Sequence, residues 1–399
     1  MSVWKEKRLG ELVSINPQQI SSKLKNGKIQ YIDISSVSRG MLSGYTEYDI
    51  SQAPSRARRI IQNHDIIYST VRPNLRAYYY VKNAPSNAVC STGFAVLRAR
   101  ESACSRFIYY LVSGKNFVDY LSLVAKGSAY PAVDTKDFEK AKILVPDLPT
   151  QQRIADILST YDDLIENNNR RITLLEQAAQ ELYKEWFVRF RFPGYENTKF
   201  ENGLPVGWKR NKLSAYYNTC SGGTPTRSKP EFYENGIFPW VKTGEIKDSI
   251  IIDTEEHITQ EAIDHSSAKL LPAKSVVMAM YGVNIGMLSY LDSIMSCNQA
   301  CCVFSDKRNF SSKHYLFYYL KSIREYLLLI SFGAAQQNLS QDLIKKLKIT
   351  MPTDDIVKDF EARVDNIYNS IRNLLYCNKN LATQRDLLLP RLMNGHWEV

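Results

Sequence analysis

The middle of the chain carries a regular apolar stripe. From Ile154 to Trp186, residues on one line follow each other at steps of four and three in strict alternation. This first seam consists of Ile154, Leu158, Tyr161, Ile165, Asn168, Ile172, Leu175, Ala179, Leu182 and Trp186. A mean period of about 3.5 residues is typical of a helix that supercoils around another helix. The pattern therefore predicts a long central helix that needs a helical partner.

A second seam lies near the C-terminus, and each of its members follows a member of the first seam by 206 residues. It consists of Phe360, Val364, Ile367, Ile371, Leu374, Asn378, Leu381, Arg385, Leu388 and Leu392. No proline or glycine lies between Pro149 and Pro193, or between Pro352 and Pro390. Each long helix is therefore the natural partner of the other.

The similarity between the two halves extends upstream of the seams. "GSAYPAVDTKDFEKAKILVP" from Gly127 corresponds to "GAAQQNLSQDLIKKLKITMP" from Gly333, and "DIIYSTVRPNLRA" from Asp65 corresponds to "SVVMAMYGVNIGM" from Ser275. The distance in residue number between corresponding segments changes slightly along the chain. Loop insertions produce such changes between two copies of one fold. Each copy begins with short apolar runs separated by Gly, Pro, Asn and Ser, which indicates a β-rich globule before each helix.

The two helices can pair in parallel or antiparallel, and an antiparallel pair gives the chain approximate two-fold symmetry. With the midpoints of the seams opposite each other, Asn168 faces Asn378 and Trp186 faces Phe360. A buried amide pair fixes helix register and orientation at some cost in stability. The alternative is that each asparagine is solvated near a frayed seam.

Composition points to a polyanionic partner. Over 399 residues, Lys and Arg exceed Asp and Glu by 10, and the isoelectric point is near 9.0. Such a balance favours nucleic acid, although a basic protein with no such partner is the alternative. The sequence has no apolar run long enough for a membrane span, and its N-terminus lacks a signal-peptide core. Seven cysteines without a paired framework fit reduced thiols in a cytoplasm.

Motifs of catalysis are missing from the sequence. It has no GxxxxGK[ST] loop, no GxGxxG after a strand, no [DN]PP[YF] tetrad and no HExxH. Cys297, Cys301 and Cys302 lack CxxC spacing, so buried thiols are expected there and no metal site is predicted. Asp162 and Asp163 are expected to be solvated on the outer face of the first helix. With the duplication and the basic charge, these absences favour a recognition protein without catalytic residues.

Specific segments resemble one protein family. "LPTQQRIADILSTYDDLIENNNRRITLLEQAAQELYKEWFVRF" from Leu148 resembles the central conserved region of the specificity subunits of type I restriction-modification enzymes. "LPVGWKRNKL" from Leu204 and "SGGTPTR" from Ser221 resemble the opening of the second target-recognition domain in that family, and "STVRPNLR" from Ser69 resembles a loop of the first.

The resemblance implies an α+β fold in which two β-rich target-recognition domains form an internal repeat and two long helices form an antiparallel coiled coil. The expected parts are target-recognition domain 1 (1–149), a central conserved helix (150–193), target-recognition domain 2 (194–353) and a C-terminal conserved helix (354–399).

The resemblance also implies a function. The family's specificity subunit is non-catalytic and needs no cofactor. Each recognition domain reads one half of a bipartite, asymmetric double-stranded DNA sequence. The helices dock two methyltransferase subunits that use S-adenosylmethionine, and restriction/translocase subunits that use ATP and Mg then join. The complex is expected in the cytoplasm of a bacterium or archaeon, with no membrane partner. Arg385 interrupts the second seam, and the second helix lacks the Gln-Gln-Arg of the first, so the two methyltransferase subunits need not bind equally well.

Candidate DNA contacts are loop residues with hydrogen-bonding side chains near glycine, which lets the backbone approach phosphate. In the first domain they are Ser38, Arg39, Ser69, Thr70, Arg72, Asn74, Arg76 and Tyr130. In the second they are Ser221, Thr224, Thr226, Arg227, Lys242, Thr243, Tyr281, Asn284, Gln336, Gln337 and Asn338. Arg72 and Arg76 suit guanine edges, and Gln336, Gln337 and Asn338 suit adenine. For each residue, a structural role in a turn or at a strand end is the alternative.

Two other functions compete with this interpretation. A single-chain enzyme that modifies DNA needs a catalytic domain, for which no residues remain. A coiled-coil scaffold that binds only proteins leaves the net charge of +10 unexplained.

Overall fold

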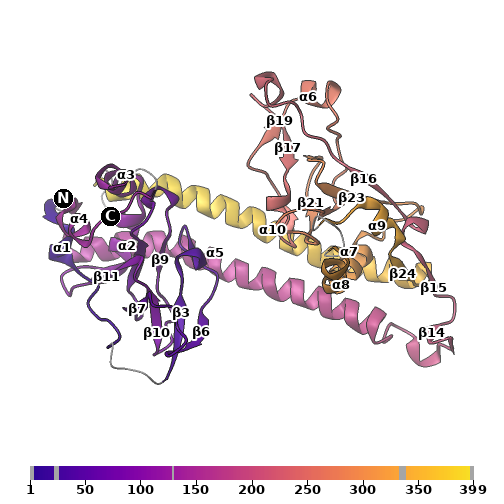
Figure 1. Cartoon of the computed structure of the whole chain (residues 1–399), viewed down its shortest axis with the longest axis horizontal. Helices are drawn as coiled ribbons and strands as arrows, with labels where there is room; N and C mark the ends of the chain where they lie inside the picture. The colour runs from indigo at the N-terminus through magenta and orange to yellow at the C-terminus, as the bar shows by residue number, and fades with distance from the viewer. Residues whose placement is uncertain (1–3, 22–26, 128–129, 332–337, 396–399) are drawn as a thin grey trace. The chain divides into compact units, whose positions relative to one another are not determined.

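The computed structural model describes residues 4–21, 27–127, 130–331 and 338–395. The chain divides into two compact units (Figure 1), of which unit 1 comprises Met1–Ile165 with Asn380–Val399 and unit 2 comprises Glu166–Lys379. Each unit holds one β-rich globule and a part of both long helices. The compact units divide within these helices, whereas the domain limits expected from the sequence lie at the helix ends.

Both predicted long helices are present. The first, α5 (Leu148–Tyr183), continues into a π-helical turn over Lys184–Val188, and the second is α10 (Asp354–Met393). Pro149 falls in the first turn of α5, where a backbone N–H has no partner within the helix. The acidic pair at Asp354 and Asp355 lies at the N-terminus of α10, where the helix dipole favours negative charge.

Within unit 2 the two helices run antiparallel. The Asn168 side-chain amide donates to the Asn378 amide oxygen at 2.9 Å, and the Asn378 amide donates to Asn169 at 2.9 Å. Further along, the rings of Trp186 and Phe360 lie 5.8 Å apart between centroids. The order of these contacts along each helix establishes the antiparallel direction, and Asn168 is buried.

Within unit 1 the helices are also antiparallel, because Leu392 packs in one core cluster with Ile154 and Leu158. Arg385 occupies its seam position by forming an ion pair with Asp162 of α5. Both side chains are less than one-third exposed. Arg385 thus fills the seam with a charged contact.

The expectation that both carboxylates are solvated holds for Asp163, which is exposed although paired, and is wrong for Asp162, which is half-buried. Asp162 accepts a hydrogen bond from the Tyr110 hydroxyl, in addition to its pair with Arg385. Asp163 pairs with Lys82 at 2.9 Å and with Arg106 at 3.1 Å. These carboxylates therefore fasten the globule of unit 1 to α5. The sequence did not indicate the contacts with Tyr110, Lys82 and Arg106, because these partners come from the globule.

The globule of unit 1 contains two four-stranded sheets. In spatial order, the first consists of β2 (Val13–Ile15), β11 (Phe94–Ala99), β8 (Ile66–Ser69) and β9 (Tyr78–Tyr80). The second consists of β6 (Thr46–Asp49), β3 (Lys28–Ile32), β10 (Ala88–Ser91) and β7 (Ala57–Ile60). Two smaller pairs are β1 (Lys5–Arg8) with β12 (Lys142–Val145) and β4 (Val37–Ser38) with β5 (Met41–Leu42). The helices are α1 (Leu9–Leu12), α2 (Ser105–Ser113), α3 (Lys115–Val124) and α4 (Thr135–Lys140).

The globule of unit 2 contains a five-stranded and a three-stranded sheet. The larger consists of β16 (Tyr217–Ser221), β23 (Cys301–Asp306), β20 (Val276–Ala279), β21 (Leu288–Leu291) and β18 (Ile250–Ile251). The smaller consists of β19 (His257–Ile258), β17 (Phe238–Val241) and β22 (Ser296–Cys297). Two smaller pairs are β15 (Lys209–Lys212) with β24 (Lys348–Met351) and β13 (Phe200–Glu201) with β14 (Leu204–Pro205). The helices are α6 (Gln260–Asp264), α7 (Lys313–Ser322), α8 (Arg324–Ser331) and α9 (Gln341–Lys346).

The predicted internal repeat is confirmed by strand pairing. The order β2-β11-β8-β9 recurs as β16-β23-β20-β21, and the parallel pair β3–β10 recurs as β17–β22. Equivalent backbone hydrogen bonds follow each central strand, since the N–H of Thr70 donates to Gly93 at 2.8 Å and that of Met280 donates to Ala300 at 2.9 Å. The two globules are copies of one fold.

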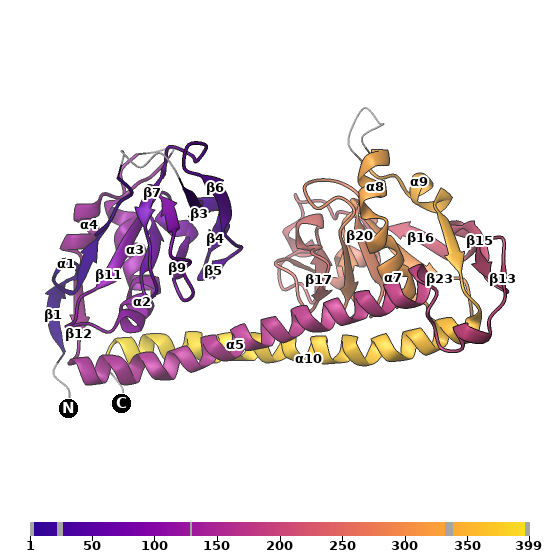
Figure 2. The ribbon, with the colours of Figure 1, turned by 90° about the horizontal axis from the view of Figure 1, so that it is seen from below.

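Aromatic cores fix each globule to its helices. In unit 2, α7 lies between the larger sheet and the long helices (Figure 2). Phe187 and Tyr315 meet at 4.7 Å between ring centroids, and Tyr290 stacks on Phe317 at 4.4 Å. In unit 1 the fully buried Tyr68 belongs to a core cluster that the globule shares with α5.

Candidate nucleic-acid interface

Three loops of unit 1 meet at one edge of the globule. They are the β4–β5 turn (38–41), the loop after β8 (69–76) and the segment 130–132, which we call loop cluster 1. The N–H of Arg39 donates to the carbonyl of Arg76 at 2.9 Å, and the N–H of Arg72 donates to the carbonyl of Pro131 at 2.7 Å. Backbone hydrogen bonds thus bring together predicted DNA contacts that are far apart in sequence.

Loop cluster 1 presents cationic and aromatic side chains. The guanidinium carbon of Arg72 lies 4.6 Å from the ring centroid of Tyr130, a cation–π geometry, and Tyr130 is 69% exposed. Arg39 and Asn74 are also exposed, whereas Arg76 is half-buried. The cluster therefore offers guanidinium groups and an open ring at one surface, which are chemical groups that bind phosphates and base edges.

Other predicted contacts in this domain support the loop instead. Ser69 is buried, and its hydroxyl donates to the carbonyl of Val71 at 2.9 Å. The Thr70 hydroxyl donates to the carbonyl of Gly93 at 2.9 Å. Ser38 is exposed on β4. These contacts favour the structural alternative for Ser69 and Thr70.

The corresponding region of unit 2 comprises residues 221–227, 242–246, 280–286 and 338, which we call loop cluster 2. The Asn284 amide donates to the carbonyls of Thr243, Gly244 and Ile246 at 3.1, 3.2 and 3.1 Å. Asn284 therefore ties two loops together, which favours the structural alternative for this residue. The tip of the loop is open, since Tyr281 is 38% exposed.

The cations of loop cluster 2 are paired with carboxylates. Arg227 and Lys242 contact Glu256 at 2.6 and 2.9 Å, and Lys242 also contacts Glu255 at 3.3 Å. The hydrogen bonds from Arg227 and Lys242 lower the pKa of Glu256, so its negative charge is stabilised. Arg227 also lies over the ring of Tyr233, 4.5 Å from its centroid. The positive charge is consequently more balanced here than in loop cluster 1.

The glycines beside these candidates serve internal packing. A Cβ atom on Gly222 would lie 1.8 Å from the carbonyl oxygen of Cys297, and one on Gly223 would lie 2.3 Å from Ser267. Ser221 accepts a hydrogen bond from the side chain of Gln341. Close packing against protein atoms therefore accounts for glycine at these two positions.

Some of the remaining candidates of unit 2 belong to the described residues and others do not. Thr224 is exposed and bonds to Gln299, and Thr226 is exposed. Asn338 is half-buried. Gln336 and Gln337 lie outside the described residues.

Comparison with known proteins identifies the family. The model of the type I restriction modification DNA specificity domain matches residues 1–177 and 205–373, which is more than half of the chain. The chain belongs to this family.

Curated members of the specificity-subunit family are similar over most of the chain. The specificity subunit of the type I restriction enzyme HindI from Haemophilus influenzae is 26% identical, over 99% of this chain and 100% of the relative. The MjaIX specificity subunit from Methanocaldococcus jannaschii is 27% identical, over 80% of this chain and 75% of the relative. The crystal structure of an S subunit of a type I restriction-modification system from M. genitalium has a TM-score of 0.60 at 14% identity, over 98% of this chain and 96% of that chain. This last similarity shows the fold.

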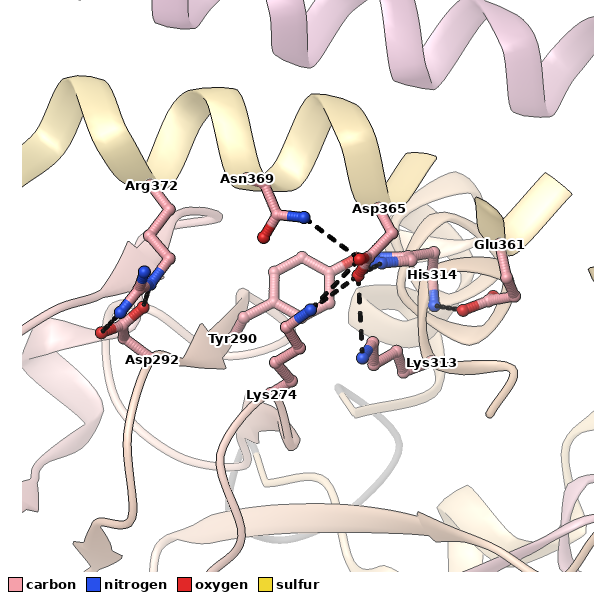
Figure 3. Close-up of polar contacts among 9 residues, drawn as sticks. All are labelled: Lys274, Tyr290, Asp292, Lys313, His314, Glu361, Asp365, Asn369 and Arg372. Atoms are coloured by element: carbon pink, nitrogen blue, oxygen red, sulfur yellow. Dashed lines mark hydrogen bonds and ion pairs between the residues drawn. The ribbon is translucent and has the colours of Figure 1, made fainter. Parts of the chain in front are cut away.

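A polar cluster that the sequence did not predict joins the second globule of this specificity-domain protein to α10 (Figure 3). Asp365 contacts Lys274 at 2.9 Å and the Nε2 atom of His314 at 3.3 Å. The hydrogen bond from His314 is the main cause of the lowered pKa of Asp365, and burial lowers the pKa of His314. Arg372 forms an ion pair with Asp292 in the same interface.

Glu361 is a buried carboxyl group of this interface (Figure 3). It accepts backbone hydrogen bonds from His314 at 3.2 Å and from Tyr315 at 2.8 Å. Burial nevertheless raises the pKa of Glu361 to about 8. The equivalent position in α5, 206 residues earlier, is the buried Ala155. A sequence signal existed, because Glu361 and Asp365 stand in the second helix where the first has Ala155 and Ser159.

The described residues contain no group of three or more His, Cys, Asp or Glu side chains arranged to hold a metal ion. Across the same residues, none of the helices has the length and apolar character of a membrane span. Cys297, Cys301 and Cys302 are buried free thiols.

Proposed function

We propose that this chain is the specificity subunit of a type I restriction-modification enzyme and has no catalytic step or cofactor of its own. Residues 1–149 and 194–353 act as target-recognition domains, each contacting one half of a bipartite duplex DNA target. The observation that carries the proposal is the family match to both halves of the chain, combined with loop clusters at equivalent places in the two copies.

The two half-sites are unlike in sequence. Identical recognition domains related by two-fold symmetry read a palindrome, whereas different domains read different half-sites. Loop cluster 1 offers Arg39, Arg72 and Arg76, and loop cluster 2 offers cations already paired with Glu256. This difference supports an asymmetric target.

The long helices dock the catalytic partners. We assign residues 150–193 and 354–399 as binding sites for two methyltransferase subunits, which carry S-adenosylmethionine and methylate adenine. Restriction/translocase subunits that use ATP and Mg complete the complex, in the cytoplasm of a bacterium or archaeon. Exposed apolar side chains on α5 support a protein partner there, since Ile157, Leu164 and Leu174 are 37%, 45% and 56% exposed.

Methylome sequencing tests the proposal. The chain is expressed with a methyltransferase subunit of the same restriction-modification system, in a host without adenine methylation. We expect one bipartite motif with a methylated adenine in each half, and no motif when either subunit is omitted. Methyl transfer from labelled S-adenosylmethionine by the pure chain alone would support a single-chain enzyme and overturn the proposal.

The salt dependence of binding separates DNA recognition from a scaffold that binds only proteins. The assembled complex should lose affinity for a duplex containing the motif as salt rises. The slope of log K against log[salt] is about −0.9 for each phosphate neutralised. A flat dependence, or equal affinity for an acidic polypeptide, would contradict DNA as the ligand.

A further inference from the structure

The paired strands β15 and β24, together with the end of α9, form a cationic surface on unit 2. Residues 209–212 and 345–348 contain six cations and no acidic residue. Lys345 is half-buried and the other five cations are exposed. We call this set the basic strip: Lys209, Arg210, Lys212, Lys345, Lys346 and Lys348. The basic strip lies mostly on regular secondary structure and shares no residue with loop cluster 2.

Carboxylates balance the same place in the first copy. There β1 pairs with β12 in the register that β15 makes with β24, and the corresponding stretches contain five cations and two glutamates. Lys142 forms an ion pair with Glu6 at 2.8 Å. In the second copy Arg210 stands in place of Glu6, and Lys345 stands in place of Glu139. Opposite charges at two positions therefore make the second surface uniformly positive, whereas the first is mixed.

The protein itself compensates little of this positive charge. Lys212 stands directly opposite Lys348 in the register of β15 and β24, and like charges in such a cross-strand pair destabilise a sheet. Among the residues that the structure describes, Lys345 has an ion pair with Asp342 at 3.9 Å, and no other cation of the basic strip has one. An anionic partner would offset the repulsion that the fold leaves in place.

The side chains of the basic strip favour phosphate over a protein surface. The centre of a protein–protein interface is depleted of lysine and enriched in aromatic side chains. Residues 209–212 and 345–348 expose no large apolar side chain. Thr350 lies opposite Arg210, at the place where the first copy has Leu144, which is 53% exposed. A guanidinium and a hydroxyl group thus share one face of the strand pair, and both are groups that bind DNA phosphate.

Helix α9 connects the basic strip to loop cluster 2. At the start of α9, the Gln341 side chain donates to Ser221 at 2.5 Å and accepts from Thr219 at 2.9 Å. The basic strip begins in the last turn of the same helix. Its six residues span about 9 Å, which corresponds to about three base pairs of duplex. A duplex held at loop cluster 2 therefore carries phosphates within a few base pairs of the basic strip.

We propose that the basic strip is a further DNA-contact surface, which holds phosphates of the duplex just beyond the second half-site. The contact is electrostatic, so it adds affinity and salt dependence without any preference for bases. The mixed surface of the first copy does not form this contact, so the DNA that flanks the target is held on one side. This inference rests on the proposed DNA-recognition function.

Three duplexes that share the methylated motif test the proposal. The first ends at both half-sites, the second extends by one helical turn beyond the second half-site, and the third extends equally beyond the first half-site. The full chain, assembled with its methyltransferase subunits, is compared with the double variant Arg210→Gln, Lys348→Gln. Each cation that neutralises a phosphate contributes about 0.9 to the salt slope.

The difference should appear on the second duplex. There the slope of log K against log[salt] should become shallower by about 2 in the double variant. Between about 50 and 200 mM salt, the unmodified complex should therefore lose roughly tenfold more affinity than the variant. On the first and third duplexes the two complexes should bind alike. The bases selected from a randomised pool should be the same for both.

Two matched changes in the first copy serve as controls. Lys5→Gln with Arg8→Gln removes the same charge from exposed positions of β1, and should leave binding to all three duplexes unchanged. Glu6→Arg with Glu139→Lys gives the first copy the charges of the second. This variant should gain affinity for the third duplex, with a steeper salt slope there. Because all these side chains are exposed, the thermal midpoints should change little.

The outcomes separate this inference from the proposed function. If the unmodified complex binds none of the duplexes, the proposed function and this inference both fail. If it binds them and the double variant has the same slope on the second duplex, the inference alone is overturned. Loss of a methyltransferase subunit from the double variant, measured by native mass spectrometry, would assign the basic strip to a protein partner. Altered base selection by the double variant would place the basic strip in the reading surface and would also overturn the inference.

Discussion

The two copies of the fold share strand order and turn geometry but place charge differently. Loop cluster 1 carries arginines in strained backbone positions, and loop cluster 2 has glycines there and pairs its cations with Glu256. Because the strand pairings match, this contrast is confined to side chains at the loops. The comparison teaches that the two copies keep the same strand pairing while the side chains of their loops differ.

The helix pairs differ in a similar way. In unit 1 the helices are joined by the ion pair between Asp162 and Arg385, and in unit 2 by the amide pair between Asn168 and Asn378. Both contacts are polar groups within apolar seams, and both fix register. An ion pair tolerates the loss of one partner less well than an amide pair, because an unpaired charge remains.

The largest expected effect follows from breaking the ion pair of unit 1. Asp162→Ala leaves Arg385 and the Tyr110 hydroxyl without their carboxylate, so the free energy of unfolding should fall by about 3 kcal/mol. Replacing Asp162 and Arg385 together with leucine should cost far less, since no charge is left unpaired. Chemical denaturation, with hydrogen exchange to locate the change in unit 1, measures both. Equal losses for the single and double variants would refute the pairing argument.

The amide pair of unit 2 should respond in the opposite direction. Replacing Asn168 and Asn378 together with leucine should raise the free energy of unfolding by about 1 kcal/mol, because an apolar pair replaces a buried polar one. The helices should then sample more than one register, which cross-linking of cysteines introduced at flanking positions would reveal. A stable pair in a single register would show that Trp186 and Phe360 suffice to set it.

Much of this arrangement could be predicted from the sequence, because helix period and internal repeat are local or linear patterns. The seams predicted both helices and their antiparallel pairing, and placed Asn168 opposite Asn378 in the structure. The same register sets Arg385 against the turn that holds Tyr161 and Asp162. The ion pair was therefore within reach of the pattern, although Asp162 was expected to be solvated.

The loops were less predictable, because their roles depend on contacts between distant segments. Asn284 resembles a DNA contact in sequence, yet three carbonyl groups from another loop take up its amide. Ser69 lies three residues before the exposed Arg72 but is buried. The left-handed backbone of Arg72 and Arg76, at places that are glycines in the second copy, becomes visible only from the φ angles of the two copies. Residue type and spacing do not carry such information.

Acidity should affect unit 2 more than unit 1, because Glu361 has no carboxyl counterpart at Ala155. Its pKa rises from about 4.3 in an unfolded chain to about 8 in the fold. The folded state therefore binds this proton more tightly, and the contribution to stability is present at pH 4 and lost as pH rises to 8. We expect the free energy of unfolding to fall steadily across this range relative to Glu361→Gln.

The difference between the native protein and Glu361→Gln isolates this group, since Lys313 and Asp306, whose charges act on Glu361, are present in both proteins. Opposing titration of His314, whose pKa is lowered, is common to both and cancels. Urea denaturation at a series of pH values measures the difference. A difference that does not vary with pH would mean that folding does not raise the pKa of Glu361.

The smallest expected effect concerns the balanced cations of loop cluster 2. Glu256→Gln removes a carboxylate that pairs with Arg227 and Lys242, and surface pairs of this kind contribute less than about 1 kcal/mol to stability. The freed cations should instead strengthen contact with DNA phosphate, so the slope of log K against log[salt] should steepen by about 1 to 2. Glu47→Gln, which breaks the exposed pair with Lys28 in unit 1, is the matched control and should leave the slope unchanged. If the slope also stays the same for Glu256→Gln, Arg227 and Lys242 serve the turn and do not contact DNA. The second domain would then rely on its other loop residues, and the contrast between the two copies would be sharper than the charges alone indicate.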